Sequence, residues 1–193
     1  MKRLSELMEQ SEYTLYCDMD GVLCNFDSRF YDLFKKEPAE IEGDPNKGSA
    51  YFWAMIHRVG KKFWSNMDPT PHGLELWAEI AKYKPALLTA PPKQKGDMTK
   101  LDPVTMEGKR EWAEKYLSPA PSEIIFKRSK DKQLIAQQDV AMGLKPILID
   151  DRESNIKEWE QAGGIALYHP KNGDPSGVIK ALKGFYESSE EGI

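Results

Sequence analysis

The sequence predicts an α/β protein: a Rossmann-like, doubly wound parallel sheet of about five strands, with a small helical cap inserted into it. Two observations lead to this prediction. Five short apolar segments lack the apolar–polar alternation of half-exposed strands, which is typical of strands buried on both faces of a parallel sheet. Amphipathic helical patterns separate most of these segments, and such a strand–helix rhythm indicates a doubly wound domain.

The predicted strands are apolar runs flanked by residues typical of turns or helix starts. They are Tyr13–Cys17, Pro85–Leu88, Ile124–Phe126, Pro146–Ile149 and Gly164–Tyr168. Apolar residues at helical spacing predict the helices that alternate with the strands. These residues are Leu74, Trp77, Ala78 and Ala81; Trp112 and Tyr116; Leu134 and Ile135; Ile156 and Trp159; and Val178, Leu182 and Phe185. We expect Ser129 to cap the third of these helices and Gly163 to end the fourth.

The stretch between the first and second predicted strands breaks this rhythm. It contains no obvious strand, and it carries two aromatic-rich pieces of helical appearance, FDSRFYDLF and SAYFWAMIHRVGKKFWSNM. A crossover helix between parallel strands needs far fewer residues. We therefore expect residues 27–83 to form an inserted helical cap, and residues 1–26 together with 84–193 to form the Rossmann-like core.

Composition excludes several classes of protein. With 193 residues, 40% of them hydrophobic and 30% charged, the chain has an ordinary globular composition. A formal net charge of −4 makes it a poor candidate for binding extended nucleic acid. No apolar run of the length of a signal peptide or membrane span is present, and two cysteines cannot form a disulfide scaffold. We expect a cytoplasmic protein without a membrane partner; the sequence does not indicate an oligomeric state.

Chemically capable residues follow the predicted strands. The first strand continues into Asp18-Met19-Asp20-Gly21, the second into Thr89-Ala90 and the fourth into Asp150-Asp151, while a basic run, KRSKDK, follows the third. In doubly wound sheets, ligands bind outside the carboxyl ends of the strands. Carboxylates, a hydroxyl and a lysine that lie far apart in the sequence are therefore expected to converge on one crevice.

This combination of side chains suits phosphoryl transfer. Asp18, Asp20, Asp150 and Asp151 would repel one another, and a hard divalent cation, Mg²⁺ being the usual one beside a phosphate, relieves that repulsion. Asp18 can then attack phosphorus to form an aspartyl-phosphate, while Asp20 protonates the leaving oxygen and later deprotonates a water. The hydroxyl of Thr89 and an ammonium group of the basic run are expected to hold the non-bridging phosphoryl oxygens.

The motifs resemble those of the haloacid dehalogenase-like (HAD) phosphohydrolases. The family's first motif, DxDxV/T, matches DMDGV at residues 18–22, its second matches LLT at 87–89, and its fourth matches IDD at 149–151. The resemblance implies a Rossmann-like core, Mg²⁺ and an aspartyl-phosphate mechanism. The family's third-motif lysine aligns best with Lys132, while Lys130 and Lys127 remain alternatives.

Within that family the chain is similar to the 5′(3′)-deoxyribonucleotidases. The shared features are DMDGVL followed by Asn25-Phe26, the inserted cap with its Phe63-Trp64 pair, GKREWAEKYL and LIDDRESNI. The resemblance implies that Phe26, Phe63 and Trp64 enclose a nucleobase, although Trp53, Phe63 and Trp64 can equally be the cap's own core. Ala90 and Lys130 are further candidates for substrate contact.

The resulting hypothesis is a Mg²⁺-dependent phosphomonoesterase of the 5′-nucleotidase type that hydrolyses (deoxy)nucleoside monophosphates. The alternatives are a polynucleotide 3′-phosphatase and another small-metabolite phosphatase of the same superfamily. A receiver-like phospho-signalling domain or a ligand-binding domain is a non-enzymatic alternative, but a receiver carries its acidic pair after the first strand, not the fourth. The basic segment 91–106 is either a substrate loop or a surface excursion.

Overall fold

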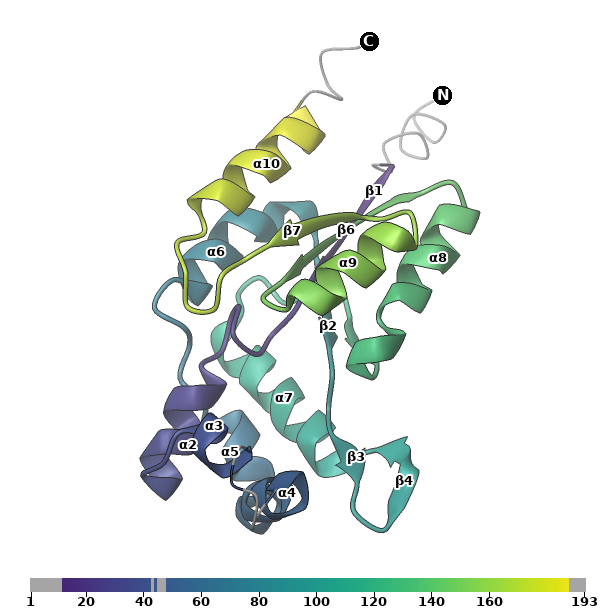
Figure 1. Ribbon diagram of the computed structural model, residues 1–193. Helices are drawn as coiled ribbons and strands as arrows, with labels where there is room; N and C mark the ends of the chain where they lie inside the picture. Colours follow the sequence, from purple (N-terminus) through teal and green to yellow (C-terminus); the bar gives the residue numbers. More distant parts are fainter. Residues whose placement is uncertain (1–11, 43, 45–47, 188–193) are drawn as a thin grey trace.

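The computed structural model describes residues 12–42, 44 and 48–187 and contains a five-stranded parallel sheet (Figure 1). The strand order is β5-β2-β1-β6-β7, with every pair of neighbours parallel. The strands are β1 (Tyr13–Cys17), β2 (Ala86–Thr89), β5 (Ile124–Phe126), β6 (Lys145–Asp150) and β7 (Ile165–Tyr168). The predicted fold class is confirmed, and each predicted strand end lies within one residue of the observed one.

Helices cover both faces of the sheet, as the doubly wound prediction requires. Those alternating with the strands are α6 (Gly73–Ile80), α7 (Pro103–Tyr116), α8 (Gln133–Ala141), α9 (Glu153–Gln161) and α10 (Ser176–Glu187). Successive residues of β1 point to opposite faces: Leu15 and Cys17 pack in a core with α6, α7 and α10, whereas Tyr16 packs in a second core with α8 and α9. The central strands are mostly apolar because both of their faces are covered by helices.

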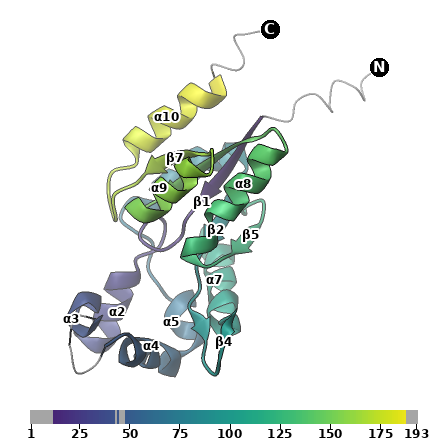
Figure 2. The same cartoon turned by 45° about the vertical axis from the view of Figure 1, so that its right-hand side comes forward.

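The larger core extends past the carboxyl ends of the strands into a group of four short helices. These are α2 (Phe26–Phe34), α3 (Pro38–Glu42), α4 (Gly48–Val59) and α5 (Lys61–Ser65), which contribute Phe30, Ile41, Phe52, Ile56 and Phe63 to it. Figures 1 and 2 both show these helices together, away from the sheet. Helix α6 falls within the same predicted insertion but packs against α10 beside the sheet. The division into core and cap at residues 27 and 83 stays a prediction.

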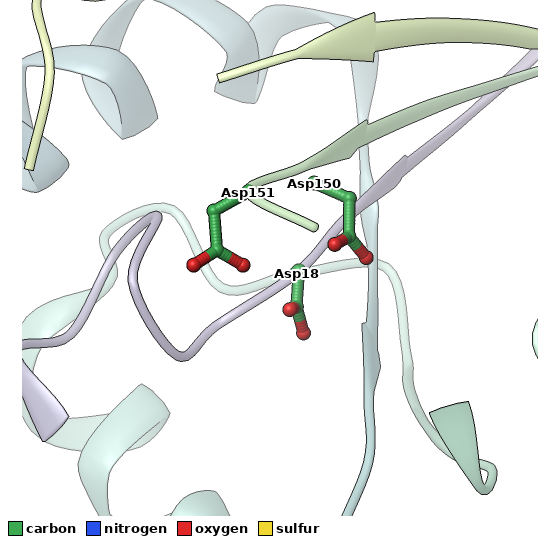
Figure 3. Close-up of side chains that lie close together, drawn as sticks. All are labelled: Asp18, Asp150 and Asp151. Carbon is green, nitrogen blue, oxygen red and sulfur yellow. The ribbon is translucent and has the colours of Figure 1, made fainter. Parts of the chain in front are cut away.

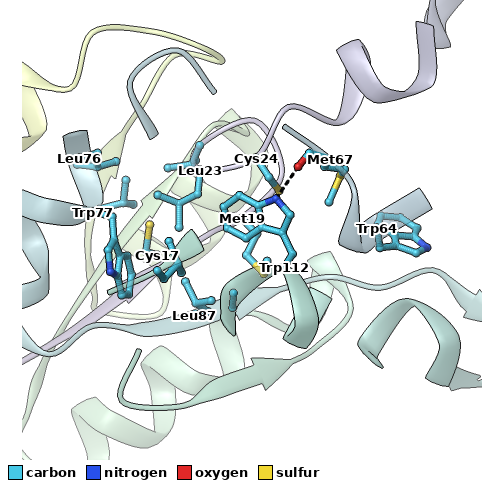
Figure 4. Packing of buried hydrophobic residues seen from close by; sticks show 14 of the residues in the cluster. Cys17, Met19, Leu23, Cys24, Trp64, Met67, Leu76, Trp77, Leu87 and Trp112 are labelled. Atoms are coloured by element: carbon cyan, nitrogen blue, oxygen red, sulfur yellow. Dashed lines mark hydrogen bonds between the residues drawn. The ribbon is translucent and has the colours of Figure 1, made fainter. Parts of the chain in front are cut away.

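Helix α7 joins the helical group to the sheet. Its Trp112 is fully buried, and the indole Nε1 donates to the carbonyl oxygen of Met67 at 2.8 Å, which fixes the chain after α5 (Figure 4). Cys17 and Cys24 lie in the same core as free thiols. Burial is the main cause that raises the pKa of both thiols, so they remain protonated and suit packing better than redox chemistry.

Two local features differ from the sequence-based expectation or go beyond it. Ser129 does not cap α8: it begins a 3-10 turn, η2 (Ser129–Asp131), and its hydroxyl donates to Asn155 Oδ1 at 2.6 Å. The basic segment after β2 forms an antiparallel hairpin of β3 (Lys93–Gln94) and β4 (Asp97–Leu101), and then enters α7. A further 3-10 turn, η1 (Ala81–Tyr83), follows α6.

Among the described residues, no helix is both long enough and apolar enough to cross a membrane.

Candidate active site

An acidic centre lies where β1 and β6 end. Cys17 of β1 is in register with Ile149 of β6, and the amide of Asp18 donates to the carbonyl oxygen of Ile149 at 2.9 Å. This pairing sets Asp18 beside Asp150, and the next residue, Asp151, completes the group (Figure 3). One carboxylate oxygen from each of the three lies within 4.8 Å of the others. The predicted convergence of these three side chains is thus present in the structure.

Gly21 lets the loop after β1 pass close to this centre. Its φ of +83° belongs to the left-handed region that favours glycine, and a Cβ atom there would lie 2.3 Å from Asp151 Oδ2. Any larger residue would displace the Asp151 carboxylate. The glycine of the DMDG motif therefore has a steric function at this site.

Lys132 binds two of the three carboxylates. Its Nζ lies 2.7 Å from Asp150 Oδ2 and 3.1 Å from Asp18 Oδ1, and its side chain is only 2% exposed. Burial acts to lower the pKa of Lys132, but the Asp18 and Asp150 carboxylates more than offset it and raise that pKa, so the lysine is a cation. Among the three lysines considered in the basic run, the structure places Lys132 against Asp18.

Asp150 is held rigidly from the opposite side. The Asn155 side-chain amide donates to both of its carboxylate oxygens at 2.9 Å, and the Arg152 backbone amide donates to Oδ1 at 2.9 Å. Asn155 in turn accepts the hydroxyl of Ser129, so β6, α9 and the turn η2 are tied together at this point. These contacts fix the side chain of Asp150, which binds Lys132 and lies beside Asp18.

Burial raises the pKa of Asp18 to about 7, and the neighbouring Asp150 carboxylate adds to the rise while Lys132 opposes it. Burial and the Asp150 carboxylate likewise raise the pKa of Asp151 to about 6. Asp151 Oδ1 is buried without a hydrogen-bond partner among the described residues. An unpartnered carboxylate oxygen and crowded negative charge suit a hard cation with oxygen ligands, and the three aspartates therefore fit Mg²⁺.

A second lysine, which the sequence analysis did not identify, binds Asp20. Lys109 of α7 is fully buried, and its Nζ donates to Asp20 Oδ2 at 2.6 Å and to Thr89 Oγ1 at 2.8 Å. The side chain of Asp20 thus lies against this lysine and outside the three-carboxylate cluster, and its part in metal binding stays a prediction. One signal was available: Lys109 shares a helix face with Trp112 and Ala113, so it lies on the buried stripe of α7.

Two cavities open beside the acidic centre. The first, of about 340 Å³, has an aromatic wall formed by Phe26, Phe52, Trp53 and Trp64. The second, of about 450 Å³, includes Asp18 and Lys132 in its lining and extends toward the hairpin. Asp20, Trp53, Ala90 and Arg152 line both cavities, so one molecule at the site can enter both.

The predicted substrate-binding residues differ in where they lie. Phe26 and Trp64 line the first cavity, Lys130 lines the second, and Ala90 lines both. Phe63 has no exposed surface and lines neither; it packs edge-on against Phe26 with ring centroids 5.3 Å apart. The structure therefore places Phe63 in the core, behind the aromatic wall.

Comparison with known proteins addresses the fold. No protein-family model matches the sequence, and no curated protein matches it. Among solved structures, a haloacid dehalogenase-like family hydrolase from Streptococcus pneumoniae gives a TM-score of 0.53 at 13% identity, covering 88% of this chain and 90% of that one. L-2-haloacid dehalogenase from Xanthobacter autotrophicus gives a TM-score of 0.51 at 12% identity, covering 90% of this chain and 88% of that one. The chain has the haloacid dehalogenase-like fold.

A HAD-family enzyme from Bacteroides thetaiotaomicron, in complex with magnesium and inorganic phosphate, gives a lower TM-score of 0.47 at 15% identity, with 86% of this chain and 98% of that chain covered. At such identities the two likenesses with TM-scores above 0.5 establish the fold alone. Chemistry at the site has to be inferred from this chain's own residues.

Proposed function

We propose that the protein is a Mg²⁺-dependent phosphomonoesterase that hydrolyses (deoxy)nucleoside monophosphates through an aspartyl-phosphate intermediate. The observation that supports this most directly is the placement of Asp18 against a buried cation, Lys132, beside a second aspartate, Asp20, at the mouth of an aromatic cavity. A nucleophile, a proton carrier, a phosphoryl-oxygen ligand and a surface for a base are thereby adjacent.

The three clustered carboxylates of Asp18, Asp150 and Asp151 are the residues that would hold Mg²⁺. A bound Mg²⁺ supplies positive charge that lets an anionic carboxylate approach an anionic phosphoryl group. Asn155 and the Arg152 amide keep Asp150 oriented for this purpose, and Gly21 leaves room for Asp151.

In the first proposed step, an Asp18 carboxylate oxygen attacks phosphorus, a P–O(Asp18) bond forms and the bond to the ester oxygen breaks. Asp20, which lines both cavities, donates its proton to the departing alkoxide. The Lys132 ammonium offsets charge on the phosphoryl oxygens. The Thr89 hydroxyl is fully buried, accepts a hydrogen bond from Lys109 and lines neither cavity, so its contact with a phosphoryl oxygen is part of the proposal only. Lys109 holds Asp20 and Thr89 in their relative positions.

In the second step, a water molecule attacks the same phosphorus atom from the side that the leaving group vacated. Asp20, now a carboxylate, accepts a proton from this water, a new P–O bond forms and the bond to Asp18 breaks. Inorganic phosphate leaves, and the cycle returns Asp20 to its protonated form and Asp18 to its carboxylate form. No redox change occurs, and the atoms of one water appear in the products.

The aromatic wall supports a nucleoside as the leaving group. Aromatic stacking contributes about 1–3 kcal/mol per base and tolerates different bases. Helices α2, α4 and α5 supply this wall, and we propose that they act as a cap that selects the substrate. The two buried free thiols accord with a reducing, cytoplasmic location, which forms part of the proposal.

The deciding experiment measures phosphate release from nucleoside 5′- and 3′-monophosphates, sugar phosphates and a 3′-phosphorylated oligonucleotide, with and without Mg²⁺. We expect Mg²⁺-dependent turnover that is fastest with nucleoside monophosphates. A preference for the oligonucleotide would favour a polynucleotide 3′-phosphatase, and a preference for sugar phosphates would favour another small-metabolite phosphatase. Turnover unaffected by removal of Mg²⁺ would contradict the proposed mechanism.

A further inference from the structure

The second cavity differs from the aromatic one in volume and in the charge of its lining. Its inner end is formed by Asp18, Lys132 and Asn155, and its outer end by the base of the hairpin and the turn after β5. The residues of the outer end are Pro91, Pro92, Lys93, Arg128, Ser129 and Lys130. Hydrolysis of a simple monophosphate, with its base in the aromatic cavity, leaves this outer end without a function.

The hairpin that forms the outer end is anchored at its base. The Asp102 amide donates to the Pro92 carbonyl at 2.9 Å, which closes the hairpin where it meets α7. The Arg128 guanidinium donates to the Thr99 carbonyl at 2.7 Å, which ties β4 to the turn after β5. Lys93 at the start of β3 is therefore placed beside the cavity by a fixed backbone.

The two cavities have opposite charge. Five carboxylates and two cations line the aromatic cavity: Asp20, Asp27, Glu37, Glu42 and Asp151 against Arg152 and Lys171. Two carboxylates and five cations line the second cavity: Asp18 and Asp20 against Lys93, Arg128, Lys130, Lys132 and Arg152. An additional anionic group on a bound substrate is repelled from the first cavity and attracted into the second.

The lysines of the outer end are not neutralised by nearby acids. Lys132 is committed to Asp18 and Asp150, but Lys93 and Lys130 have no ion-pair partner within the described part of the chain. Both lysines line the second cavity, and they come from two different segments, the hairpin and the turn η2. Such an arrangement suits the oxygens of a second phosphate.

We propose that the outer end of the second cavity is a second phosphate subsite, and that the preferred substrates are nucleotides with a second phosphate group in addition to the one transferred to Asp18. This inference rests on the proposed function and narrows its substrate class. The reacting phosphate meets Asp18, the base lies against the aromatic wall, and the second phosphate lies between Lys93 and Lys130. A nucleoside 3′,5′-bisphosphate has these three parts.

The first test compares kcat/KM for deoxyadenosine 3′,5′-bisphosphate with kcat/KM for the deoxyadenosine monophosphates. We expect the wild-type protein to favour the bisphosphate, and Lys93→Ala and Lys130→Ala each to lower the ratio of the two values about tenfold, as expected for one lost charge-assisted hydrogen bond. Lys95→Ala is the matched control, because Lys95 is exposed on the same hairpin and lines neither cavity. An unchanged ratio in both lysine variants would overturn the subsite.

Equilibrium binding separates this inference from the proposed function. With Asp18→Asn protein, in which the proposed mechanism removes turnover, calorimetry should show tighter binding of the bisphosphate than of the monophosphate, and adding Lys93→Ala should remove that advantage. Equal affinities for the two ligands would overturn the subsite. Wild-type protein that binds the bisphosphate more tightly but releases no phosphate from any substrate would overturn the proposed function and leave the subsite standing.

A 5′-phosphorylated dinucleotide identifies the source of the second phosphate. Its phosphodiester presents phosphate oxygens at the position of the 3′-phosphate. A Lys93-dependent gain limited to the bisphosphate supports free nucleotides as the natural substrates. An equal Lys93-dependent gain with the dinucleotide supports the subsite as well, with strand ends as its occupant.

Discussion

Two buried lysines lie beside the acidic centre, and they are held in different ways. Lys132 contacts two carboxylates, Asp18 and Asp150, that come from adjacent strands of the sheet. Lys109 contacts one carboxylate, Asp20, and the Thr89 hydroxyl, and it reaches them from α7 while its Nζ lies 5.2 Å from the centre of the Trp64 ring. Lys132 thus contacts the carboxyl ends of the strands, which are called the sheet edge below. Lys109 links this sheet edge to the helices that form the aromatic wall.

The carboxyl ends of the strands and the α7 side therefore serve different parts of the proposed mechanism. At the carboxyl ends of the strands, the parallel register brings Asp18, the proposed nucleophile, beside Asp150, and Lys132 reaches both from between η2 and α8. On the α7 side, Lys109 holds Asp20, the proposed proton carrier, and lies against Trp64 of the aromatic wall. Chemistry at phosphorus should therefore depend on the sheet edge for every substrate, whereas the α7 side should matter more as the leaving group becomes harder to expel.

The largest expected effect is at the sheet edge itself. Asp18→Asn should lower kcat at least about 10³-fold, because an amide cannot form the covalent intermediate. The measurement is phosphate release under saturating Mg²⁺, with circular dichroism to verify folding. Asp32→Asn is a matched control that makes the same substitution on α2, away from both cavities. Near-normal turnover by Asp18→Asn would exclude the covalent mechanism.

Lys132→Met should lower kcat/KM by about 10²–10³-fold, because the phosphoryl oxygens lose a fixed cation. It should also lower the free energy of unfolding of the metal-free protein at pH 8 by about 3–5 kcal/mol, because two buried carboxylates lose their partner. Urea denaturation measures this loss. Lys127→Met, a half-buried lysine of the same basic run that lines neither cavity, is the control and should change neither quantity appreciably.

Lys109→Met should have a smaller effect that depends on the leaving group. Without Lys109, Asp20 loses the contact that positions it for proton donation, and kcat/KM for a nucleotide should fall about 10²-fold. For p-nitrophenyl phosphate, whose leaving group departs without a proton, the fall should be several-fold at most. Equal losses for both substrates would show that Lys109 has a structural role and does not position the acid.

The contrast between the lysines also explains what could be predicted from the sequence. The strands, and the meeting of Asp18 with Asp150, follow from apolar runs and from the register of parallel strands. Lys109 was missed because a lysine on a charged helix appears solvated until α5 and Trp64 are known to cover it. Phe63 and Trp64 are adjacent on the short helix α5, and only packing reveals that the second faces the cavity while the first lies behind it.

The β3–β4 hairpin and the direction of the Asp20 side chain could not be predicted from the sequence either. A polar, lysine-rich segment gives no apolar pattern from which pairing can be predicted, so the β3–β4 hairpin and its position beside the second cavity were not predicted. Asp20 was grouped with the other aspartates because motif spacing does not reveal the direction of a side chain. The Lys109 Nζ, 2.6 Å from Asp20 Oδ2, holds this side chain on the α7 side.

The raised carboxyl pKa values predict how Mg²⁺ binding depends on pH. With folded pKa values of about 7 for Asp18 and about 6 for Asp151, the protonated forms favour the folded state, and this stability is fully present below the ordinary value of 3.8. It is lost as pH rises through 6 and 7. Because Mg²⁺ binds the ionised carboxylates, its effect on Tm should be several degrees larger at pH 8 than at pH 5.5, as differential scanning fluorimetry can measure.

A control links this pH dependence to the cluster. In Asp151→Asn, one of the two raised carboxyl groups is absent, so the difference between the Mg²⁺-induced Tm shifts at the two pH values should shrink. If the Tm shift were the same at both pH values in the wild-type protein, protons and Mg²⁺ would not compete for these carboxylates, and the acidic centre would not be the metal site.

The smallest expected effect concerns the aromatic wall, and it tests whether that wall selects the substrate. Trp53 is half-buried and lines both cavities, so Trp53→Ala should raise KM for nucleotides about tenfold through lost stacking and leave KM for p-nitrophenyl phosphate nearly unchanged. Phe63→Leu is the matched control, because it alters the core behind the wall and should lower Tm without this selectivity. If both variants raised KM for both substrates alike, the aromatics would serve only as the core of the helical group, and selection would have to lie in the charged cavity.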